Sequence, residues 1–225
     1  MQKITVLLAD DHTLVRQGFR ALLEAEPDIA IVGEAETGRQ AVQLARKLRP
    51  DVVLMDIAMP LLNGLEATRQ IIREVPSSKV LVLSSYSDDE YVHQLTEAGA
   101  AGYMLKGAVV TDLIKAIREV RKGRAFFSPA IHKRLLDRYR ETLVKGVPLR
   151  KRTDLLTSRE AEVLQLIAEG EANKQIAAEL GISIKTVERH RQRLMNRLGI
   201  HDIAGLTRYA MSKGVIESGR PIGAL

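Results

Sequence analysis

The sequence predicts an α/β fold, a doubly wound five-stranded parallel sheet, followed by a small all-α domain. Two observations carry this prediction. In the first half of the 225-residue chain, short apolar runs alternate with amphipathic patterns of helical spacing, which is typical of parallel strands joined by right-handed helical crossovers. The second half has helical patterns, and the chain length suits two domains of ordinary size.

Five apolar runs in the first half have the length and composition of buried strands. Helices cover both faces of a doubly wound sheet, so its strands are apolar nearly throughout. The predicted strands are Ile4 to Ala9, Ile29 to Gly33, Val52 to Met55, Val80 to Leu83 and Gly102 to Leu105.

Each predicted strand is followed by an amphipathic stretch whose apolar residues recur at helical spacing. These helices are Leu14 to Ala25, Arg39 to Leu48, Leu65 to Val75, Asp89 to Ala98 and Asp112 to Lys122. Thr37 and Thr111 are predicted N-caps, because a hydroxyl can accept a hydrogen bond from a free amide of the first turn. Pro50 and Pro76 mark helix exits.

A connector separates the two halves. Ser128-Pro129 is a typical helix start, with the serine as N-cap, and it follows Phe126 and Phe127. An apolar stripe on the next helix is predicted to pack within the chain or on a second subunit: Ile131, Leu135, Tyr139 and Leu143. We therefore divide the chain into residues 1–122, a linker of residues 123–152 with one amphipathic helix, residues 153–217 and a tail of residues 218–225.

Four helical segments make up the second half. Thr157 and Glu160 form a capping box, and Ser183 and Asp202 are further N-caps. The segments are Ala161 to Glu169, Asn173 to Leu180, Ser183 to Leu198 and Asp202 to Lys213, ended by Gly170, Gly181, Gly199 and Gly214. Their predicted shared core is Ile176, Ala177, Leu180, Val187, Leu194 and Leu198.

Composition excludes several classes of protein. The chain has no cysteine, which excludes disulfide scaffolds, thiolate metal sites and cysteine nucleophiles. No apolar run approaches the roughly 20 residues of a membrane span. The first residues also lack a signal-peptide cleavage pattern, so we expect a cytoplasmic protein with no membrane partner.

Charge is unevenly distributed between the halves. Residues 1–120 hold 13 basic and 17 acidic side chains, whereas residues 121–225 hold 21 basic and 11 acidic ones. Clustered cations bind polyanions such as DNA because binding releases counterions. The second half is therefore predicted to bind a polyanion, with a solvated basic surface as the alternative.

Acidic and polar residues follow the predicted strands. Asp10 and Asp11 come after the first strand and Asp56 after the third, while Ser84 follows the fourth and Lys106 the fifth. Ligands of doubly wound sheets bind at the carboxyl ends of the strands, so these side chains are predicted to form one site. An all-oxygen set of carboxylates favours a hard cation such as Mg²⁺.

Neither glycine-rich phosphate-binding pattern, the P-loop or the dinucleotide fingerprint, occurs in the sequence. An aspartate can itself accept a phosphoryl group when Mg²⁺ and a lysine neutralise the oxygens. Asp56 is the predicted nucleophile, because Asp10 and Asp11 are adjacent on one strand end and are suited to holding the metal.

Five motifs in residues 1–122 resemble the flavodoxin-like receiver domain of two-component response regulators. They are Val6 to His12, Met55 to Pro60, Gly64, Leu83 to Ser85 and Gly102 to Lys106. The resemblance implies a doubly wound sheet, a histidine kinase as partner and Mg²⁺ as cofactor.

The resemblance also implies individual roles. Asp56 would accept the phosphoryl group, and Ser84 and Lys106 would bind its oxygens. Ser84 and Tyr103 would be the switch residues, and Gly107 stands where many receivers have proline. The implied Mg²⁺ ligands, direct or through water, are Asp10, Asp11, Asp56 and the backbone carbonyl of Ala58.

The third helix of the second half has a long polar face. It consists of Lys185, Glu188, Arg189, Gln192 and Asn196. Two helices joined by a tight glycine turn, the second with exposed Arg and Gln, are typical of a helix-turn-helix whose second helix enters the DNA major groove. A generic helical bundle with a charged face is the alternative.

Residues 153–217 resemble the LuxR-type helix-turn-helix domain. The motifs are Leu156 to Leu164, Gly170, Asn173 to Ala177, Ile182 to His190 and Leu198-Gly199. Joined to a receiver, this domain indicates the NarL/FixJ subfamily of response regulators.

By that resemblance, three side chains would face bases in the groove: Glu188, Arg189 and Gln192. The implied phosphate contacts are Lys174, Lys185, Thr186, His190, Arg193 and Arg197. The last helix resembles the dimer-forming element of the family through Ile203, Leu206 and Tyr209, although core packing accounts for part of that stripe.

The expected function is control of transcription by phosphorylation of Asp56, through dimerisation, release of the helix-turn-helix domain, or both. No enzymatic activity is expected beyond self-phosphorylation from a donor and autodephosphorylation. The expected partners are double-stranded DNA, a histidine kinase and a second copy when phosphorylated, with RNA polymerase as a further candidate. The alternatives are a constitutive DNA-binding regulator and a Mg²⁺-dependent phosphatase with an aspartate nucleophile.

Overall fold

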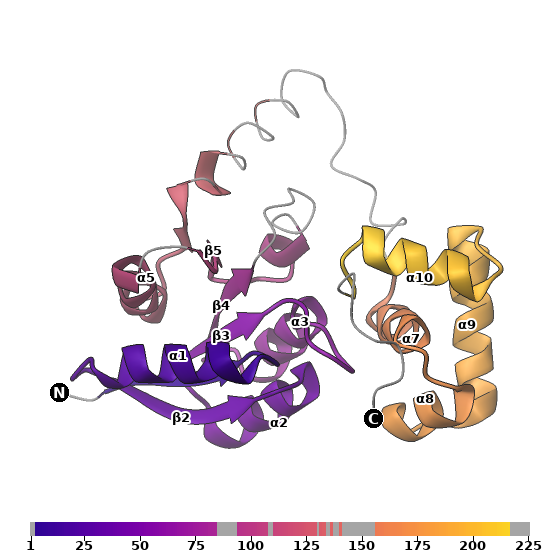
Figure 1. The fold of residues 1–225 in the computed structure, drawn as a ribbon, viewed down its shortest axis with the longest axis horizontal. Helices are drawn as coiled ribbons and strands as arrows, with labels where there is room; N and C mark the ends of the chain where they lie inside the picture. Colours follow the sequence, from indigo (N-terminus) through magenta and orange to yellow (C-terminus); the bar gives the residue numbers. More distant parts are fainter. Residues whose placement is uncertain are drawn as a thin grey trace.

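The computed structural model describes residues 3–84, 94–107, 110–129, 131–133, 136, 140 and 156–216. It has an α/β domain, described here over residues 3–133, and a helical domain over residues 156–216 (Figure 1). Within these residues, no helix is long and apolar enough to cross a membrane.

The α/β domain contains a parallel sheet with strand order β2-β1-β3-β4-β5-β6. The strands are β1 (Ile4–Ala9), β2 (Ile29–Ala35), β3 (Val52–Asp56), β4 (Lys79–Ser84), β5 (Gly102–Leu105) and β6 (Phe126–Phe127). This arrangement confirms the predicted fold class, because every paired strand is parallel and helices follow the strands along the chain.

Helices cover the two faces of the sheet and enclose two separate cores. The helices are α1 (Thr13–Glu24), α2 (Gly38–Leu48), α3 (Gly64–Glu74) and α5 (Val110–Arg121). Successive strand residues point to opposite faces. Thus Leu7 lies in the core beneath α2 and α3, whereas Val6 and Leu8 lie in the core beneath α1 and α5.

The helical domain packs four helices around a third core. They are α7 (Ser158–Ala168), α8 (Asn173–Leu180), α9 (Ile184–Leu198) and α10 (Ile203–Ser212). The predicted capping box of Thr157 and Glu160 is present, and Ser183 and Asp202 accept hydrogen bonds from first-turn amides. All the predicted core residues belong to this cluster, with Leu198 partly buried at its edge.

Four details differ from the prediction or lie beyond the description. β6 is a sixth strand, formed in the segment predicted as linker, because Phe126 and Phe127 pair with β5. Thr111 lies inside α5 instead of capping it. Of the predicted linker stripe, Ile131 is fully buried in the core beneath α2 and α3, and the rest lies outside the described residues. The predicted helix from Asp89 to Ala98 is described only from residue 94.

Candidate acidic site and nucleic-acid interface

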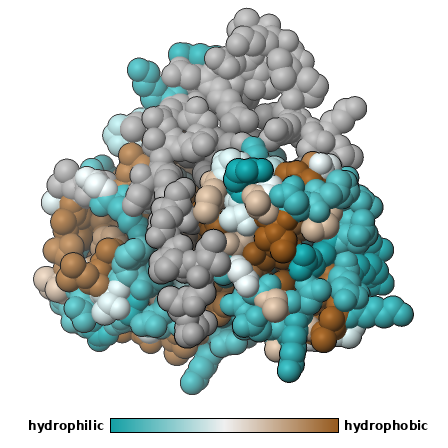
Figure 2. Space-filling model, turned by 45° about the vertical axis from the view of Figure 1, so that its right-hand side comes forward, coloured by the Kyte–Doolittle hydropathy of each residue, from teal (hydrophilic) through white to brown (hydrophobic). Residues whose placement is uncertain are grey.

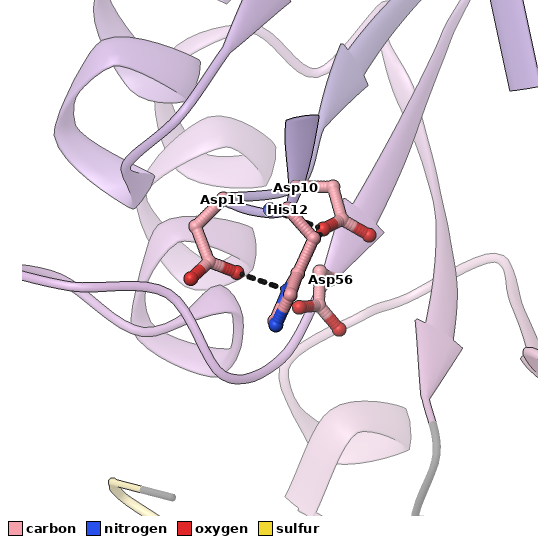
Figure 3. A group of neighbouring side chains, drawn as sticks. All are labelled: Asp10, Asp11, His12 and Asp56. Atoms are coloured by element: carbon pink, nitrogen blue, oxygen red, sulfur yellow. Dashed lines mark hydrogen bonds and ion pairs between the residues drawn. The ribbon is translucent and has the colours of Figure 1, made fainter. Parts of the chain in front are cut away.

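The carboxyl ends of β1 and β3 bring three aspartates together. Asp10 and Asp11 directly follow β1, and Asp56 is the last residue of β3. Each of these residues, with His12, offers a ligand atom, and the four atoms lie within 4.8 Å of one another (Figure 3). The predicted strand-end acids are therefore neighbours in space.

Lys106 joins this cluster from the end of β5. Its Nζ lies 2.8 Å from Asp10 Oδ2 and 3.0 Å from Asp56 Oδ1. Its backbone N–H donates to the carbonyl of Ser84, which keeps the carboxyl ends of β4 and β5 side by side. Ser84, the last residue of β4, is itself buried.

Burial shapes the electrostatics of the cluster. Burial raises the pKa of Asp56, Lys106 opposes this rise and Asp10 adds to it. Burial lowers the pKa of Lys106, but the attraction of Asp56 and Asp10 outweighs it, so the net direction is upward. The carboxylates are buried close together with one ammonium group among them, an arrangement that favours the binding of a further cation.

The donor set fits a hard divalent cation. Asp56 Oδ2 is buried and has no hydrogen-bond partner among the described residues. Magnesium favours carboxylate and carbonyl oxygens together with water. Asp10, Asp11 and Asp56 supply the carboxylates, and Ala58 lies in the loop that leaves β3.

Gly64 allows the loop after β3 to turn back tightly. A Cβ at this position would lie 1.9 Å from the backbone oxygen of Asp56. The Gly64 N–H donates to the carbonyl of Ile57, which closes the loop at the start of α3. A glycine is required here because any larger residue would collide with the backbone of Asp56.

His12 and Arg16 support the cluster and have no role in the sequence prediction. His12 Nδ1 lies 2.9 Å from Asp11 Oδ1. Arg16 is buried on α1, where its Nη1 donates to the carbonyl of Asp10 and its Nη2 donates to Glu36. An arginine on an amphipathic helix is usually solvent-exposed. The acidic residues of β2 and of the turn after it were the sequence signal that could have indicated a buried partner for Arg16.

Tyr103, the predicted switch aromatic, lies in β5 and is 1% exposed. It belongs to the core that also contains Met55 and Ile57. Its ring is therefore inside the domain in this structure.

The predicted groove-facing residues lie together on the open face of α9. Glu188, Arg189 and Gln192 are exposed, and Gln192 donates to Asn196 one turn further on. Figure 2 shows hydrophilic side chains over much of the visible face of the helical domain. The apolar positions Val187 and Leu194 of the same helix are fully buried.

The predicted phosphate contacts have different surroundings. Lys174, Lys185 and Arg193 are exposed, whereas Thr186 and His190 are half-buried. Burial lowers the pKa of His190, and the cations of Arg159, Arg189 and Arg193 lower it further. Arg197 pairs with buried Glu160, 3.0 Å away, and thereby connects α9 to the capping box of α7.

On the last helix, the three residues of the predicted dimer stripe lie in three different environments. Leu206 is fully buried in the helical core, while Ile203 is 55% exposed. Tyr209 is half-buried at the edge of that core. Core packing therefore accounts for Leu206, and Ile203 is the member of the stripe available to a partner.

Comparison with protein families identifies both halves. Residues 6–118 match the response regulator receiver domain, and residues 154–210 match the luxR family of bacterial regulatory proteins. Together these ranges contain the acidic cluster and α9.

Two relatives that match along most of their length are transcriptional regulatory proteins. The chain is 43% identical over 207 residues to the transcriptional regulatory protein LiaR of Bacillus subtilis, covering 92% of this chain and 96% of LiaR. It is 40% identical to DegU of Brevibacillus brevis, covering 89% of each.

Among solved structures, RcsB of Salmonella enterica serovar Typhimurium, bound to a promoter in the presence of phosphomimetic BeF3⁻, matches with a TM-score of 0.60. The identity is 29%, covering 92% of this chain and 98% of RcsB. The chain therefore belongs to the NarL/FixJ subfamily of two-component response regulators, which join a receiver to a LuxR-type DNA-binding domain and regulate transcription.

Proposed function

We propose that Asp56 accepts a phosphoryl group from a histidine kinase and that this modification controls DNA binding by α9. The observation that carries the proposal is the environment of the Asp56 carboxylate. One oxygen pairs with Lys106, and the other is buried without a hydrogen-bond partner among the described residues. Such a carboxylate is positioned and incompletely neutralised, as a nucleophile toward an electrophilic phosphorus must be.

In the proposed transfer, a carboxylate oxygen of Asp56 attacks phosphorus of the kinase phosphohistidine. An O–P bond forms, the N–P bond breaks, and its electron pair remains on the imidazole nitrogen. The Lys106 ammonium would offset charge on the phosphoryl oxygens, and the hydroxyl of Ser84 would donate to one of them.

Magnesium, when bound, would supply further positive charge to those oxygens. We assign its ligands to Asp10, Asp11, Asp56 and the carbonyl of Ala58. Attack of water on phosphorus of the acyl phosphate would break its O–P bond, release inorganic phosphate and restore the aspartate. We expect no catalysis beyond self-phosphorylation from a small donor and this autodephosphorylation.

Phosphorylation replaces the single charge of the Asp56 carboxylate with a phosphoryl group that carries close to two negative charges, so it adds about one negative charge at the sheet edge. We propose that Ser84 and Tyr103 respond to this charge and change the surface of the receiver, residues 1–122. The DNA-binding domain, residues 153–217, would then be released, dimerise, or both, through the linker of residues 123–152. Exposed Ile203 on α10 is the side chain we assign to a dimer contact.

On DNA, we assign base contacts to Glu188, Arg189 and Gln192. Arginine can bond guanine edges and glutamine adenine edges. Lys174, Lys185, Thr186, His190, Arg193 and Arg197 would contact phosphates, which fix the register of the helix without reading sequence. RNA polymerase is a further partner that this role implies.

The test is the intact mass of the chain after incubation with Mg²⁺ and a small acyl-phosphate donor. We expect wild type to gain one phosphate and Asp56→Asn to gain none. Equal incorporation in both proteins would overturn the assignment of Asp56. Release of inorganic phosphate from an unrelated phosphoester, far beyond one equivalent, would favour the phosphatase alternative.

A further inference from the structure

We propose that Gln165 of α7 is a positioning residue for the phosphorylation site, through which docking of the helical domain opposes phosphorylation of Asp56. The inference rests on the proposed function. It concerns the β3–α3 loop, residues 57–63, and a docking face formed by Glu162, Gln165 and Glu169 of α7 with Glu179 of α8.

The carboxamide of Gln165 bridges two backbone positions of the β3–α3 loop. Its Nε2 donates to the carbonyl of Met59 at 2.9 Å, and its Oε1 accepts from the N–H of Asn63 at 2.7 Å. Gln165 is 1% exposed, so these bonds are shielded from water. A single side chain of the helical domain thus fixes both sides of the loop.

Glu169 holds the centre of the same loop. Its carboxylate accepts from the N–H of Leu61 at 3.2 Å and from Gln165 Nε2 at 2.8 Å. Leu61 has a φ of +66°, a left-handed conformation that a leucine rarely adopts. Its side chain packs against the core of the helical domain. The loop therefore has a conformation that contacts from the other domain stabilise.

This loop is part of the phosphorylation site by direct connection. It begins at the residue after Asp56 and contains Ala58, the proposed carbonyl ligand of Mg²⁺. It ends at Asn63, which caps α3 by accepting from the N–H of Glu66. A restraint on Met59, Leu61 and Asn63 consequently acts within a few residues of the phosphoacceptor.

Charge gives the direction of the coupling. The docking face presents the carboxylates of Glu162, Glu169 and Glu179 to the α/β domain. Arg39 neutralises part of this charge, with its Nε 2.6 Å from Glu179 and its Nη2 3.5 Å from Glu162. A phosphoryl group on Asp56 would add negative charge at the start of the loop that this acidic face contacts, which disfavours docking. By reciprocity, docking disfavours phosphorylation by the same factor.

Docking leaves the polar face of α9 exposed. Glu188, Arg189 and Gln192 of α9 are exposed in the docked arrangement, whereas the interdomain contacts above come from α7 and α8. Figure 1 shows α7 on the side of the helical domain that faces the sheet. The docked state is therefore inferred to act on the phosphorylation loop and on domain orientation, and not by covering α9.

The test compares full-length wild type with Gln165→Ala. We expect the variant to take up phosphate from the small donor about tenfold faster, because two shielded hydrogen bonds that favour docking are lost. Gln17→Ala, which removes a carboxamide from the exposed surface of α1, is the control and should match wild type.

Domain separation is measured in the same proteins. The chain has no cysteine, so spin labels at Gln43→Cys on α2 and Asn196→Cys on α9 are unique. We expect one narrow distance in the unphosphorylated parent and a broad distribution in Gln165→Ala before any donor is added. An unchanged rate together with an unchanged distance distribution would overturn the coupling.

Because Gln165→Ala alters a buried residue and could misfold, a second test exchanges two charges across the interface. Arg39→Glu should speed phosphorylation by repelling Glu179, and Arg39→Glu with Glu179→Arg should return the rate toward wild type. A double variant as fast as the single one would contradict the interface. Failure of wild type itself to take up phosphate would instead contradict the proposed function. The coupling, which rests on that function, would then be contradicted as well.

Discussion

The acidic cluster and the open face of α9 are both rich in charge, but they differ in where that charge lies. Asp10 and Asp56 are 3% and 4% exposed, whereas Arg189 and Gln192 lie in the open. Buried charges alter each other's pKa values and favour a bound ion. Exposed charges interact weakly with each other and remain free to bind a polyanion. The arrangement of charge in the first site thus favours a bound ion, and that in the second leaves the cations accessible to a polyanion.

The largest effect is expected from substitution of Lys106. Lys106→Ala should slow phosphorylation of Asp56 about 100-fold, because a positioned cation in a buried site stabilises developing charge. The measurement is the initial rate of phosphate uptake by intact mass. Lys115→Ala removes an exposed lysine from α5 and should leave that rate unchanged. Equal rates for wild type and both variants would show that burial confers no special role on Lys106.

Loss of a base contact should have the next largest effect. Arg189→Ala is expected to weaken binding to a preferred duplex by about 1–3 kcal/mol and to relax the choice of base at one position. Binding titrations with duplexes differing at single base pairs measure both effects. A uniform loss across all duplexes would assign Arg189 to the phosphates instead.

Arg193 provides the matched contrast on the same helix. Arg193→Ala should weaken binding to all duplexes alike and lower the salt dependence of the binding constant by about one counterion. Titrations at several salt concentrations measure this slope. A change in sequence preference without a change in slope would reverse the roles of the two arginines.

The smallest effect concerns stability. A raised pKa means that folded Asp56 binds a proton more readily than the unfolded chain does, so its ionised form costs stability at pH values above that pKa. Asp56→Asn should therefore stabilise the metal-free chain by about 1 kcal/mol, or about 3 °C in Tm.

The stabilisation should disappear below the ordinary aspartate pKa, where the wild-type carboxyl is also neutral. Added Mg²⁺ should stabilise wild type more than the variant. Thermal unfolding with and without Mg²⁺ checks both statements, and a destabilised Asp56→Asn at neutral pH would contradict them.

Much of the fold could be predicted because its signals are local. The five longer strands and the caps of the helical domain, such as Ser183 and Asp202, depend on residues adjacent in sequence. β6 was missed because a two-residue strand has no pattern of its own, and Phe126 and Phe127 become a strand only by pairing with β5.

The same distinction applies to the sites. Asp10, Asp56 and Lys106 were predicted to lie together because the topology of a parallel sheet places strand ends side by side. Arg16 and Gln165 were not found, because their significance depends on partners about 20 to 100 residues away. An interdomain hydrogen bond leaves no periodic or local signal in either segment.

We infer that phosphorylation in the buried cluster governs DNA binding by the exposed face of α9. The direct measurement is affinity for a duplex selected from a random pool by the phosphorylated chain, with and without donor, for wild type and Asp56→Asn. We expect tighter binding by wild type only when the donor is present, and weak binding by Asp56→Asn in both conditions. Donor-independent binding by wild type at the same affinity as the phosphorylated form would contradict it.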